Sequence, residues 1–355
     1  MPYIIDVGTA VPDNKVGQDD VRQFAARIFR GALQVDRLLP VFRNTRISER
    51  HFCVDDDWFE TEKTFSEKNS VYLEQGVKLA ERAVRDVLMR TDIPAERIGH
   101  IFFISSTGIS TPSLDAHLFN RISLNPSVMR TPIWGLGCSG GVAGIVRAAD
   151  WLRAYPDRLA LVVALELCGL TFIRGDLSKS NFVASSLFAD GCGAVVMAGD
   201  SQASRWARRI SVESASSVTW PDTLDIMGWK IVETGLKVIF SRSIPAVVTK
   251  AARPVILDFL HSHGLYPSDI AHFLAHPGGQ KVIEAYRDSL GLEEHAIQSM
   301  QQVLSKFGNM SSATVLFVLT HFLDSNRFRQ DDLIFSTALG PGFCSEAFLG
   351  RCEGN

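Results

Sequence analysis

The segment TPIWGLGCSGGVAGIVRAADWLRAYPD, residues 131–157, predicts a short strand, a sharp turn and a helix. The turn is rich in glycine, and Cys138 follows Gly137 where the helix begins. After the turn, apolar side chains recur at helical spacing at Val142, Ile145, Ala149 and Leu152. A strand followed at once by a helix is the repeating unit of α/β folds, so the segment predicts an α/β protein.

The flanking sequence supports the same fold class. An amphipathic helix is predicted over residues 71–90, with Leu73, Val77, Ala80, Val84 and Leu88 on one face. Apolar runs predict strands at residues 100–106, 159–165, 271–276 and 333–339. Unbroken apolar runs of this length between helices are typical of parallel strands that are covered on both faces.

A constant separation in the sequence indicates an internal structural repeat. A shift of 171 residues relates Ile104 to Ala275, Cys138 to Asn309 and Val162 to Leu333. The first pair lies in predicted strands, the second at helix starts after a glycine, and the third in the next strands. The repeat predicts two similar layered halves, residues 1–200 and 205–355, with a seam near residues 201–209 and functional turns meeting at the junction.

Composition places the chain among large globular proteins. It has 355 residues, of which 46% are apolar and 21% charged, and its formal net charge is −3. This excludes a disordered or fibrous chain and gives no reason to expect a nucleic-acid partner. No stretch approaches the ~20 consecutive apolar residues of a transmembrane segment. The N-terminus lacks the apolar core and basic leader of a signal peptide, so we expect a cytoplasmic protein.

Cys138 is the candidate nucleophile among six cysteines. Six are too few for a disulfide scaffold in this length, and none forms a CxxC pair, so no metal site is expected. Unpaired backbone N–H groups at the start of a helix favour a thiolate at Cys138. The alternative is a buried cysteine in a packing turn, and both interpretations stay open. The hydrolase elbow GxSxG is not matched, because Leu136 stands where its first glycine would fall.

Two further residues complete a candidate catalytic set. His276 ends an apolar run and is followed by a proline and two glycines, which favours it over its nearest rival, His272. Asn309 follows a glycine and precedes an apolar helix; taken alone it would be a helix cap, and its catalytic candidacy rests on the repeat. A cysteine, a histidine and an amide donor together indicate acyl transfer through a stabilised oxyanion.

These residues lie in longer motifs that resemble a known family. The motifs are WGLGCSGG around Cys138, LFADG at 187–191, AHPGG at 275–279, GNMSS at 308–312 and GPGF at 340–343. They resemble those of thiolase-fold condensing enzymes, specifically the type III polyketide synthases of the chalcone synthase family. ELCGLTF and STPSLDAHL resemble bacterial members that make alkylpyrones from long-chain acyl-CoA. The resemblance implies an α/β, thiolase-like fold of two αβαβα halves and a homodimer.

The resemblance also implies roles for individual residues. Cys138 would take the starter acyl group from CoA, and His276 and Asn309 would bind the malonyl carbonyl and stabilise the enolate left by decarboxylation. Phe188 matches one of two gatekeeper phenylalanines, while the other gate position falls near Val238, where the absence of phenylalanine predicts a wider passage. Cavity-lining positions fall on Ser106, Thr107, Thr111, Cys168, Thr171 and Ser311. Candidates for the basic CoA entrance are Arg43, Arg46 and Arg50.

The implied activity is condensation of a long-chain acyl-CoA with malonyl-CoA, followed by lactonisation to an alkylpyrone. No metal or other cofactor is expected, because decarboxylation drives the carbon–carbon bond. The alternatives are a single-condensation enzyme of the ketoacyl synthase III type, an alkylresorcinol-forming synthase, a papain-like hydrolase with the same Cys, His, Asn order, and a non-catalytic binding module. Cys344 is expected in the core rather than as a second, thiolase-type base.

Overall fold

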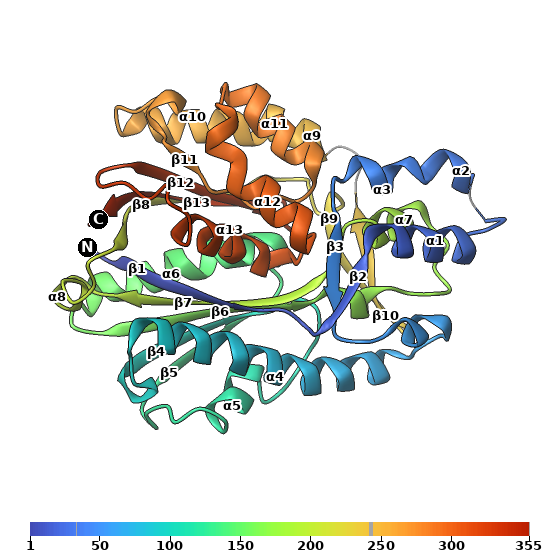
Figure 1. Ribbon diagram of the computed structural model, residues 1–355, viewed down its shortest axis with the longest axis horizontal. Coiled ribbons are helices and arrows are strands. Elements are labelled where there is room, and N and C mark those ends of the chain that lie inside the picture. Colours follow the sequence, from blue (N-terminus) through green and yellow to red (C-terminus); the bar gives the residue numbers. More distant parts are fainter. Residues whose placement is uncertain (33, 241–243, 355) are drawn as a thin grey trace.

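The computed structural model describes residues 1–32, 34–240 and 244–354 (Figure 1). Nine strands of this described part form one mixed sheet in the order β11-β12-β13-β8-β1-β7-β6-β4-β5. The first five in sequence are β1 (Tyr3–Ala10), β4 (Ile98–Ile104), β5 (Met129–Ile133), β6 (Leu159–Leu167) and β7 (Asp190–Ala198). The others are β8 (Arg209–Thr219), β11 (His272–Phe273), β12 (Leu333–Gly340) and β13 (Cys344–Glu353).

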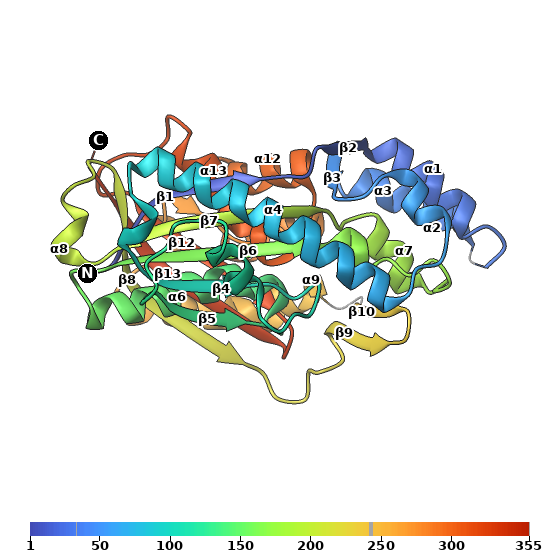
Figure 2. The ribbon, with the colours of Figure 1, turned by 90° about the horizontal axis from the view of Figure 1, so that it is seen from below.

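The sheet and the helices form alternating layers (Figure 1). Two central helices, α6 (Gly140–Ala154) and α13 (Thr314–Leu323), lie between the strands of the two halves. On one outer side lie α4 (Phe65–Thr91) and α5 (Leu114–Phe119), and on the other α10 (Arg253–Ser262) and α11 (Gln280–Leu290). Figure 2 shows α4 running along the strands it covers. The predicted α/β, thiolase-like layering is confirmed.

Strands β6 and β7 lie in the interior of the molecule, and the strands of the sheet run in both directions. Every residue of both strands is buried, as expected for apolar runs covered on two faces. β4 pairs in parallel with β5 and β6, and β11 pairs in parallel with β12. However, β7 is antiparallel to both of its neighbours, and β13 is antiparallel to both of its own. The sheet is therefore mixed rather than parallel throughout.

The two halves use the same strand arrangement. The order β1-β7-β6-β4 in the first half corresponds to β8-β13-β12-β11 in the second, and β1 and β8 pair at the junction. The predicted strand at 271–276 is shorter than expected, covering only His272–Phe273, although His276 N still donates to Thr337 O at 2.8 Å. The division at residues 200 and 205 stays a prediction.

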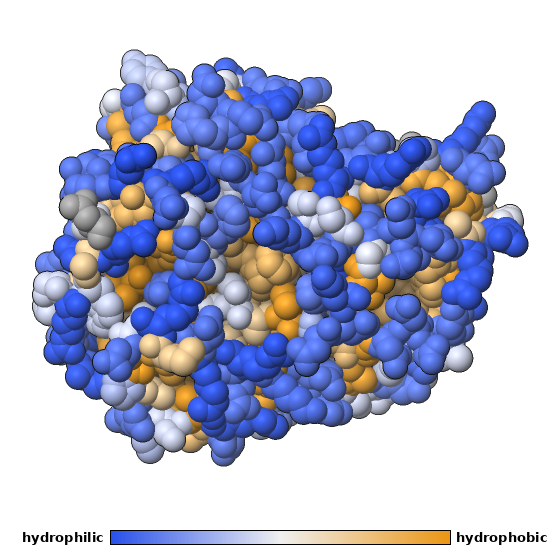
Figure 3. Space-filling view, in the orientation of Figure 1, coloured by the Kyte–Doolittle hydropathy of each residue, from blue (hydrophilic) through white to orange (hydrophobic). Residues whose placement is uncertain are grey.

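Smaller elements gather at the end of the molecule opposite the two termini (Figures 1 and 2). These are α1 (Gln18–Ile28), α2 (Val35–Leu38), α3 (Pro40–Asn44), α7 (Lys179–Ser185), the β2–β3 ribbon (Asn14–Gly17, Glu49–Phe52) and the β9–β10 hairpin (Met227–Val232, Gly235–Phe240). Phe29, Phe42 and Phe182 form a separate small core beneath α1 and α3. Figure 3 shows apolar side chains between polar ones on this part of the surface.

Three further α-helices complete the described part of the chain. They are α8 (Asp200–Ala203), α9 (Ile244–Val247) and α12 (Gln298–Phe307). No helix in the described part of the chain combines the length and apolarity required to cross a bilayer.

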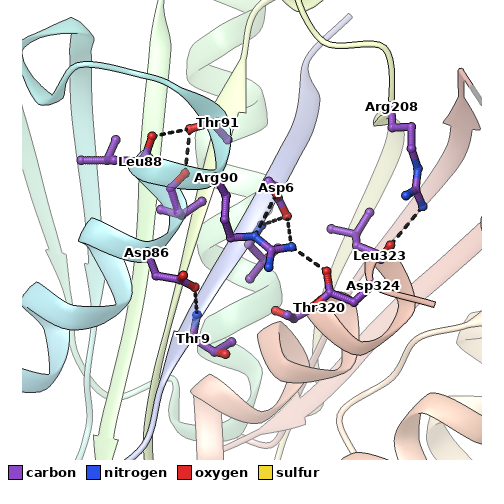
Figure 4. A network of polar contacts seen from close by, with 12 residues as sticks. Asp6, Thr9, Asp86, Leu88, Arg90, Thr91, Arg208, Thr320, Leu323 and Asp324 are labelled. Atoms are coloured by element: carbon purple, nitrogen blue, oxygen red, sulfur yellow. Dashed lines mark hydrogen bonds and ion pairs between the residues drawn. The ribbon is translucent and has the colours of Figure 1, made fainter.

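An arginine joins elements of both halves (Figure 4). Arg90, near the end of α4, donates to both carboxylate oxygens of Asp6 in β1 at 3.0 Å and to Asp324, just after α13, at 2.6 Å. These two carboxylates raise the pKa of Arg90 above its ordinary value. Because the contacts reach α13, they help to keep the outer helix α4 in register with the central helices.

Candidate active site

Cys138 lies in a tight turn directly before α6. The turn Gly137–Ser139 is a single 3₁₀ turn, and the Cys138 side chain is only 6% exposed. Burial raises the pKa of the Cys138 thiol to about 12, although a hydrogen bond with Ser311 lowers it. The start of α6 alone therefore does not produce a thiolate, and the thiol form is favoured until a substrate or partner group helps to remove the proton.

The two central helices approach each other closely beside this cysteine. A Cβ atom on Gly141 would lie 2.3 Å from Ser312 O, so only glycine permits this contact. The approach places Ser311 Oγ 3.5 Å from Cys138 Sγ. Ser311 itself has a φ of +47°, a left-handed conformation that is uncommon for residues with a side chain. The turns before α6 and α13 thus meet at the sulfur.

His276 is buried, and its ring makes no hydrogen bond within the described structure. Its side chain is 5% exposed, and neither ring nitrogen has a hydrogen-bond partner among the described residues. Burial lowers the pKa of His276 to about 3, so the ring is neutral and carries one N–H and one free acceptor nitrogen at ordinary pH. The rival His272 is instead held by Asp332, with Nε2 2.9 Å from Oδ2.

Asn309 is fixed by the main chain around it. Its Oδ1 accepts a hydrogen bond from Ser311 N at 2.8 Å, and its Nδ2 donates to Gly278 O at 3.1 Å. Its backbone pairs with the segment 187–189 through Asn309 N to Leu187 O and Ala189 N to Asn309 O, both 2.9 Å. Asn309 caps neither α13 nor the 3₁₀ turn Ser311–Ala313 before it, whose cap residues are Ala313 and Met310. The contacts leave the second N–H of Nδ2 available for a substrate oxygen.

The three residues line one cavity, which we call the catalytic cavity, with a volume of about 350 Å³. They come from the turn before α6, the end of the β11 segment and the turn before α13. Its other lining residues are Val41, Asn44, Thr45, Lys179, Val183, Leu187, Met227, Phe240, Gly278, Gly279, Gln280, Lys281, Val282, Tyr286 and Leu339. A thiol, a neutral imidazole and an amide facing one space can bind and polarise a thioester carbonyl.

A second space, the aromatic pocket, lies on the other side of α7. It has a volume of about 80 Å³ and is lined by Val16, Asp20, Val21, Phe24, Arg50, Phe52, Asp56, Phe59, Cys168, Gly169, Thr171, Phe172, Asn181, Ala184, Ser185, Phe188 and Val238. Phe188 packs against Phe240 of the catalytic cavity, with ring centroids 6.1 Å apart. Burial raises the pKa of the Cys168 thiol in this pocket, and Glu166, Asp190 and Cys138 add to the rise.

The comparisons with known proteins match this arrangement. Residues 2–201 match the family described as chalcone and stilbene synthases, N-terminal domain, and residues 211–352 match the C-terminal domain of the same family. The chain belongs to the chalcone and stilbene synthase family, and it is a type III polyketide synthase.

Individual relatives and solved structures agree with this assignment. A Bacillus subtilis (strain 168) protein described as "Putative chalcone synthase" is 42% identical over 99% of both chains. "Alpha-pyrone synthesis polyketide synthase-like Pks18" of Mycobacterium tuberculosis is 30% identical over 97% of this chain and 89% of its own length. The crystal structure of 1,3,6,8-tetrahydroxynaphthalene synthase from Streptomyces coelicolor A3(2) superposes with a TM-score of 0.93 at 26% identity, covering 99% of this chain and 100% of that one.

The synthase contains a buried carboxylate that the sequence analysis missed. Glu166, in β6, accepts hydrogen bonds from Ser106 N at 3.0 Å, Thr107 Oγ1 at 2.9 Å and Ser312 Oγ at 2.6 Å. Burial raises the pKa of Glu166 to about 7 against these three donors. A single charged residue in the otherwise apolar run LALVVALEL was the available signal.

Two of the six family cavity positions and both gate positions line the aromatic pocket. Cys168, Thr171, Phe188 and Val238 line the aromatic pocket, and Ser311 contacts the Cys138 sulfur. Ser106 and Thr107 line neither space in the described structure: Ser106 N and Thr107 Oγ1 donate to Glu166, while Ser106 Oγ accepts from Gly137 N at 3.2 Å, next to Cys138. Thr111 is exposed in the single chain and lines neither space, so its role as a cavity residue stays a prediction.

The second gate position is Val238, which lies beside Phe188 as the resemblance implied. Phe240, two residues along the same strand, packs on the Phe188 ring and lines the catalytic cavity. An aromatic side chain is therefore present close to Val238, and the wider passage stays a prediction. The alternation of side chains along β10 places both residues on one face.

The structure separates the three arginines predicted at the CoA entrance, and the role of the two exposed ones stays a prediction. Arg43 and Arg46 are exposed beside Asn44 and Thr45, which line the catalytic cavity, but neither arginine lines it. Arg50 is completely buried, so it is excluded from a surface entrance. Lys179, at the start of α7, and Lys281, in the first turn of α11, do line the cavity and were not singled out from the sequence.

Replacing Ser311 with alanine should make the Cys138 thiol a weaker acid. The hydroxyl donates to the thiolate, so its loss removes a charge-assisted hydrogen bond and raises the pKa of Cys138 by about one unit. The iodoacetamide alkylation rate should fall about tenfold at any pH below that pKa, since only the thiolate reacts. The measurement is the pH dependence of alkylation at Cys138. Ser211→Ala serves as control, because it removes a buried hydroxyl in β8 that contacts Arg351 O and lines neither space. Identical profiles for both variants would contradict the assignment.

Proposed function

We propose that this type III polyketide synthase loads a long-chain acyl group from acyl-CoA onto Cys138, extends it with malonyl-CoA and releases an alkylpyrone. The observation that carries the proposal is the pairing of the catalytic cavity with an apolar, aromatic-walled pocket at Cys168 and Phe188. An alkyl chain in that pocket gains about 0.8 kcal/mol for each buried CH₂ group. The relative named as an alpha-pyrone synthase supports the same product class.

The catalytic cavity suits a CoA thioester. Lys179 and Lys281 place two ammonium groups on its wall, and exposed Arg43 and Arg46 lie beside it. Such cations bind phosphate groups through charge-assisted hydrogen bonds. We propose that the CoA phosphates bind on this side, with the pantetheine arm leading to Cys138.

The proposed loading step exchanges one thioester for another. The Cys138 sulfur attacks the acyl carbonyl, the bond between carbonyl carbon and CoA sulfur breaks, and the Cys138 proton leaves with CoA. Neutral His276 is able to accept and pass on that proton, because its free nitrogen has no competing partner. The N–H groups of His276 and Asn309 then face the developing oxyanion.

The proposed extension step uses the same donors. Malonyl-CoA loses carbon dioxide, and the resulting enolate oxygen is held by the His276 and Asn309 N–H groups. The enolate carbon attacks the acyl carbonyl on Cys138, and the sulfur leaves as a thiolate. The extended chain is now a thioester of the CoA that carried the malonyl group, so the Cys138 thiolate attacks it, releases that CoA and takes up the chain for the next round. After the last round, an enol oxygen of the chain attacks the thioester carbonyl and the carbon–sulfur bond breaks, which closes the pyrone and releases the thiol with the enol proton. Loss of carbon dioxide drives each condensation, so we propose that CoA thioesters suffice without a metal or flavin.

Product mass tests this assignment. Purified protein given dodecanoyl-CoA and radiolabelled malonyl-CoA should release a lipophilic lactone whose mass corresponds to several acetate units added to the starter. A product with one added unit would indicate a single-condensation enzyme. An aromatic product would favour aldol closure instead; a Streptomyces peucetius relative, 36% identical and named 1,3,6,8-tetrahydroxynaphthalene synthase, is the observation in its favour.

We also propose that the synthase is a homodimer. β5 is the edge strand of the large sheet, and the large apolar side chains around it are exposed: Met129 by 49%, Trp134 by 51% and Ile109 by 42%. Exposed apolar residues grouped beside an unpaired edge strand are typical of a protein interface. Light scattering should give twice the 39.1 kDa chain mass, and Trp134→Glu should shift it towards the monomer. A monomeric wild type would refute the proposal.

Enlarging Val238 should shorten the chains that the synthase accepts. Val238→Phe adds a ring beside Phe188 and fills part of the aromatic pocket, so long chains lose apolar contact. Use of dodecanoyl-CoA should fall at least about tenfold relative to hexanoyl-CoA, which corresponds to two or more methylene groups excluded. The measurement is kcat/KM for both starters. Ile239→Phe changes the adjacent residue on the opposite strand face and should leave the ratio near the wild-type value.

A further inference from the structure

Arg50 is a buried cation with unused hydrogen-bond donors. It lies in β3 and is completely buried, and its Nη1 donates to Ser185 O and Phe188 O, both at 2.8 Å. Its Nε and Nη2 are buried without a hydrogen-bond partner among the described residues. In a guanidinium group, Nε–H and one Nη–H lie side by side on one edge and form a two-pronged donor. Such a donor in an apolar surrounding strongly favours an acceptor.

Arg50 differs in this respect from the other polar residues of the aromatic pocket. Thr171, Asn181 and Ser185 also line it, and each of these side chains donates to a main-chain carbonyl. Their hydrogen-bonding capacity as donors is therefore used within the fold. Among the buried side chains that line the pocket in the described structure, only Arg50 has donors without a partner. Because Arg50 itself lines the pocket, these buried donors are the ones that an oxygen of an occupant would satisfy.

The surrounding charges indicate what kind of acceptor would suit Arg50. The neighbouring carboxylate, Asp190, accepts hydrogen bonds from Gly169 N at 2.7 Å and Cys53 N at 2.8 Å rather than from Arg50. Asp190 nevertheless balances the charge, since Arg50 lowers its pKa while burial raises it. A ligand carboxylate would bring a second negative charge next to Asp190, and it would pass Asp20 and Asp56, which also line the pocket. An uncharged oxygen supplies lone pairs without this repulsion.

We propose that the aromatic pocket prefers acyl chains that carry an uncharged oxygen acceptor, a hydroxyl or a carbonyl, which the free edge of Arg50 binds. The remaining walls, including Phe24, Phe52, Phe59 and Phe172, accommodate the alkyl part of such a chain. This inference rests on the proposed function, in which the pocket receives the acyl group held by Cys138. The oxygen has two sources: it is carried by the starter, or it is a carbonyl that the synthase installs by condensation.

A competition experiment tests the first source on the unaltered protein. Dodecanoyl-CoA and its positional hydroxydodecanoyl-CoA isomers compete for Cys138 without malonyl-CoA, and intact-protein mass spectrometry reports which acyl group is loaded. At least one isomer should load about tenfold in preference to the plain chain, equivalent to about 1.4 kcal/mol. A hydroxyl group lowers the gain from apolar burial, so this preference requires a specific donor.

Product analysis with Arg50 variants tests the second source. If the acceptor is an installed carbonyl, the wild type shows no isomer preference, but Arg50→Gln and Arg50→Lys release products with fewer malonyl units. Val16→Ala changes the same pocket without changing its donors and should affect hydroxylated and plain chains alike. No isomer preference together with an unchanged number of extensions would overturn the inference.

The outcomes also separate this inference from the proposed function. If dodecanoyl-CoA loads and is extended but oxygen has no effect, only the role of Arg50 fails. If dodecanoyl-CoA does not load at all, the long-chain function fails as well. Thermal unfolding establishes whether each variant is folded. Should neither Arg50 variant fold, two competitions with the wild type decide the question: the hydroxydodecanoyl-CoA isomers test an oxygen carried by the starter, and 3-oxododecanoyl-CoA against dodecanoyl-CoA tests an installed carbonyl. No preference in either competition would overturn the inference.

Discussion

Cys138→Ala should abolish formation of both the acyl-enzyme and the polyketide. The sulfur is the atom that would carry every intermediate, and no other thiol lines the catalytic cavity in the described structure. We expect turnover to fall by at least about 10⁴-fold, as for removal of other covalent nucleophiles. Intact-protein mass spectrometry after incubation with dodecanoyl-CoA should show no mass increase, and radiolabelled malonyl-CoA should give no lipophilic product.

Cys344→Ala is the matched control for this experiment. Cys344 is also buried and lies 3.3 Å from Ser139 Oγ, but its Sγ donates to Pro341 O and it lines neither cavity. We expect the Cys344 variant to form the acyl-enzyme normally. An adduct that persists in Cys138→Ala, or one that disappears in Cys344→Ala, would show that the nucleophile has been misassigned.

His276→Ala should slow condensation by roughly 10²–10³-fold, the effect of losing one preorganised oxyanion donor. The His276 pKa of about 3 means that the ring stays neutral as the pH falls from 8 to 5, so the donor should not be altered by titration in that range. Condensation in single turnovers, started from the preloaded acyl-enzyme, should therefore show no pH step assignable to His276. The measurement is the single-turnover rate of malonyl-CoA decarboxylation against pH.

Two comparisons make the His276 prediction specific. Asn309→Ala should cause a loss of similar size, and the double variant should lose less than the product of the two effects, because both donors serve one oxygen. His272→Ala removes a histidine that is bound to Asp332 and should lower thermal stability more than the condensation rate. A step in the wild-type rate near pH 6 that is absent from His276→Ala would show that this imidazole is not held neutral.

The fold and the three central residues could be predicted because local patterns determine them. The apolar runs around Phe102, Val162 and Phe335 each form a buried strand. Turns rich in small residues precede the two central helices. The separation of 171 residues correctly brought the Cys138 and Asn309 turns together, where Gly141 meets Ser312. His276 was chosen over His272 from its glycine neighbours, and the structure leaves only His276 in the cavity.

The errors concern residues whose surroundings come from distant segments. Arg50 looked like a surface arginine, but its contacts with Ser185 and Phe188 lie more than 130 residues away in sequence. Lys281 became a cavity residue only because α11 begins beside His276. Burial and partner choice of this kind depend on tertiary packing, which alternation and helical periodicity do not encode.

Residues 187–189 pair with Asn309 through two main-chain hydrogen bonds. The segment that carries Phe188, the proposed gate residue, therefore also positions the side-chain amide of Asn309. If Phe188 is the gate that we propose, exchanging its side chain should change which starters fit, while these two hydrogen bonds, which are made by the main chain, stay intact. Inserting or deleting a residue there would shift the amide away from the sulfur. Diversification of products in such an enzyme should therefore proceed by point substitution at the partition, while the length of that segment stays constant.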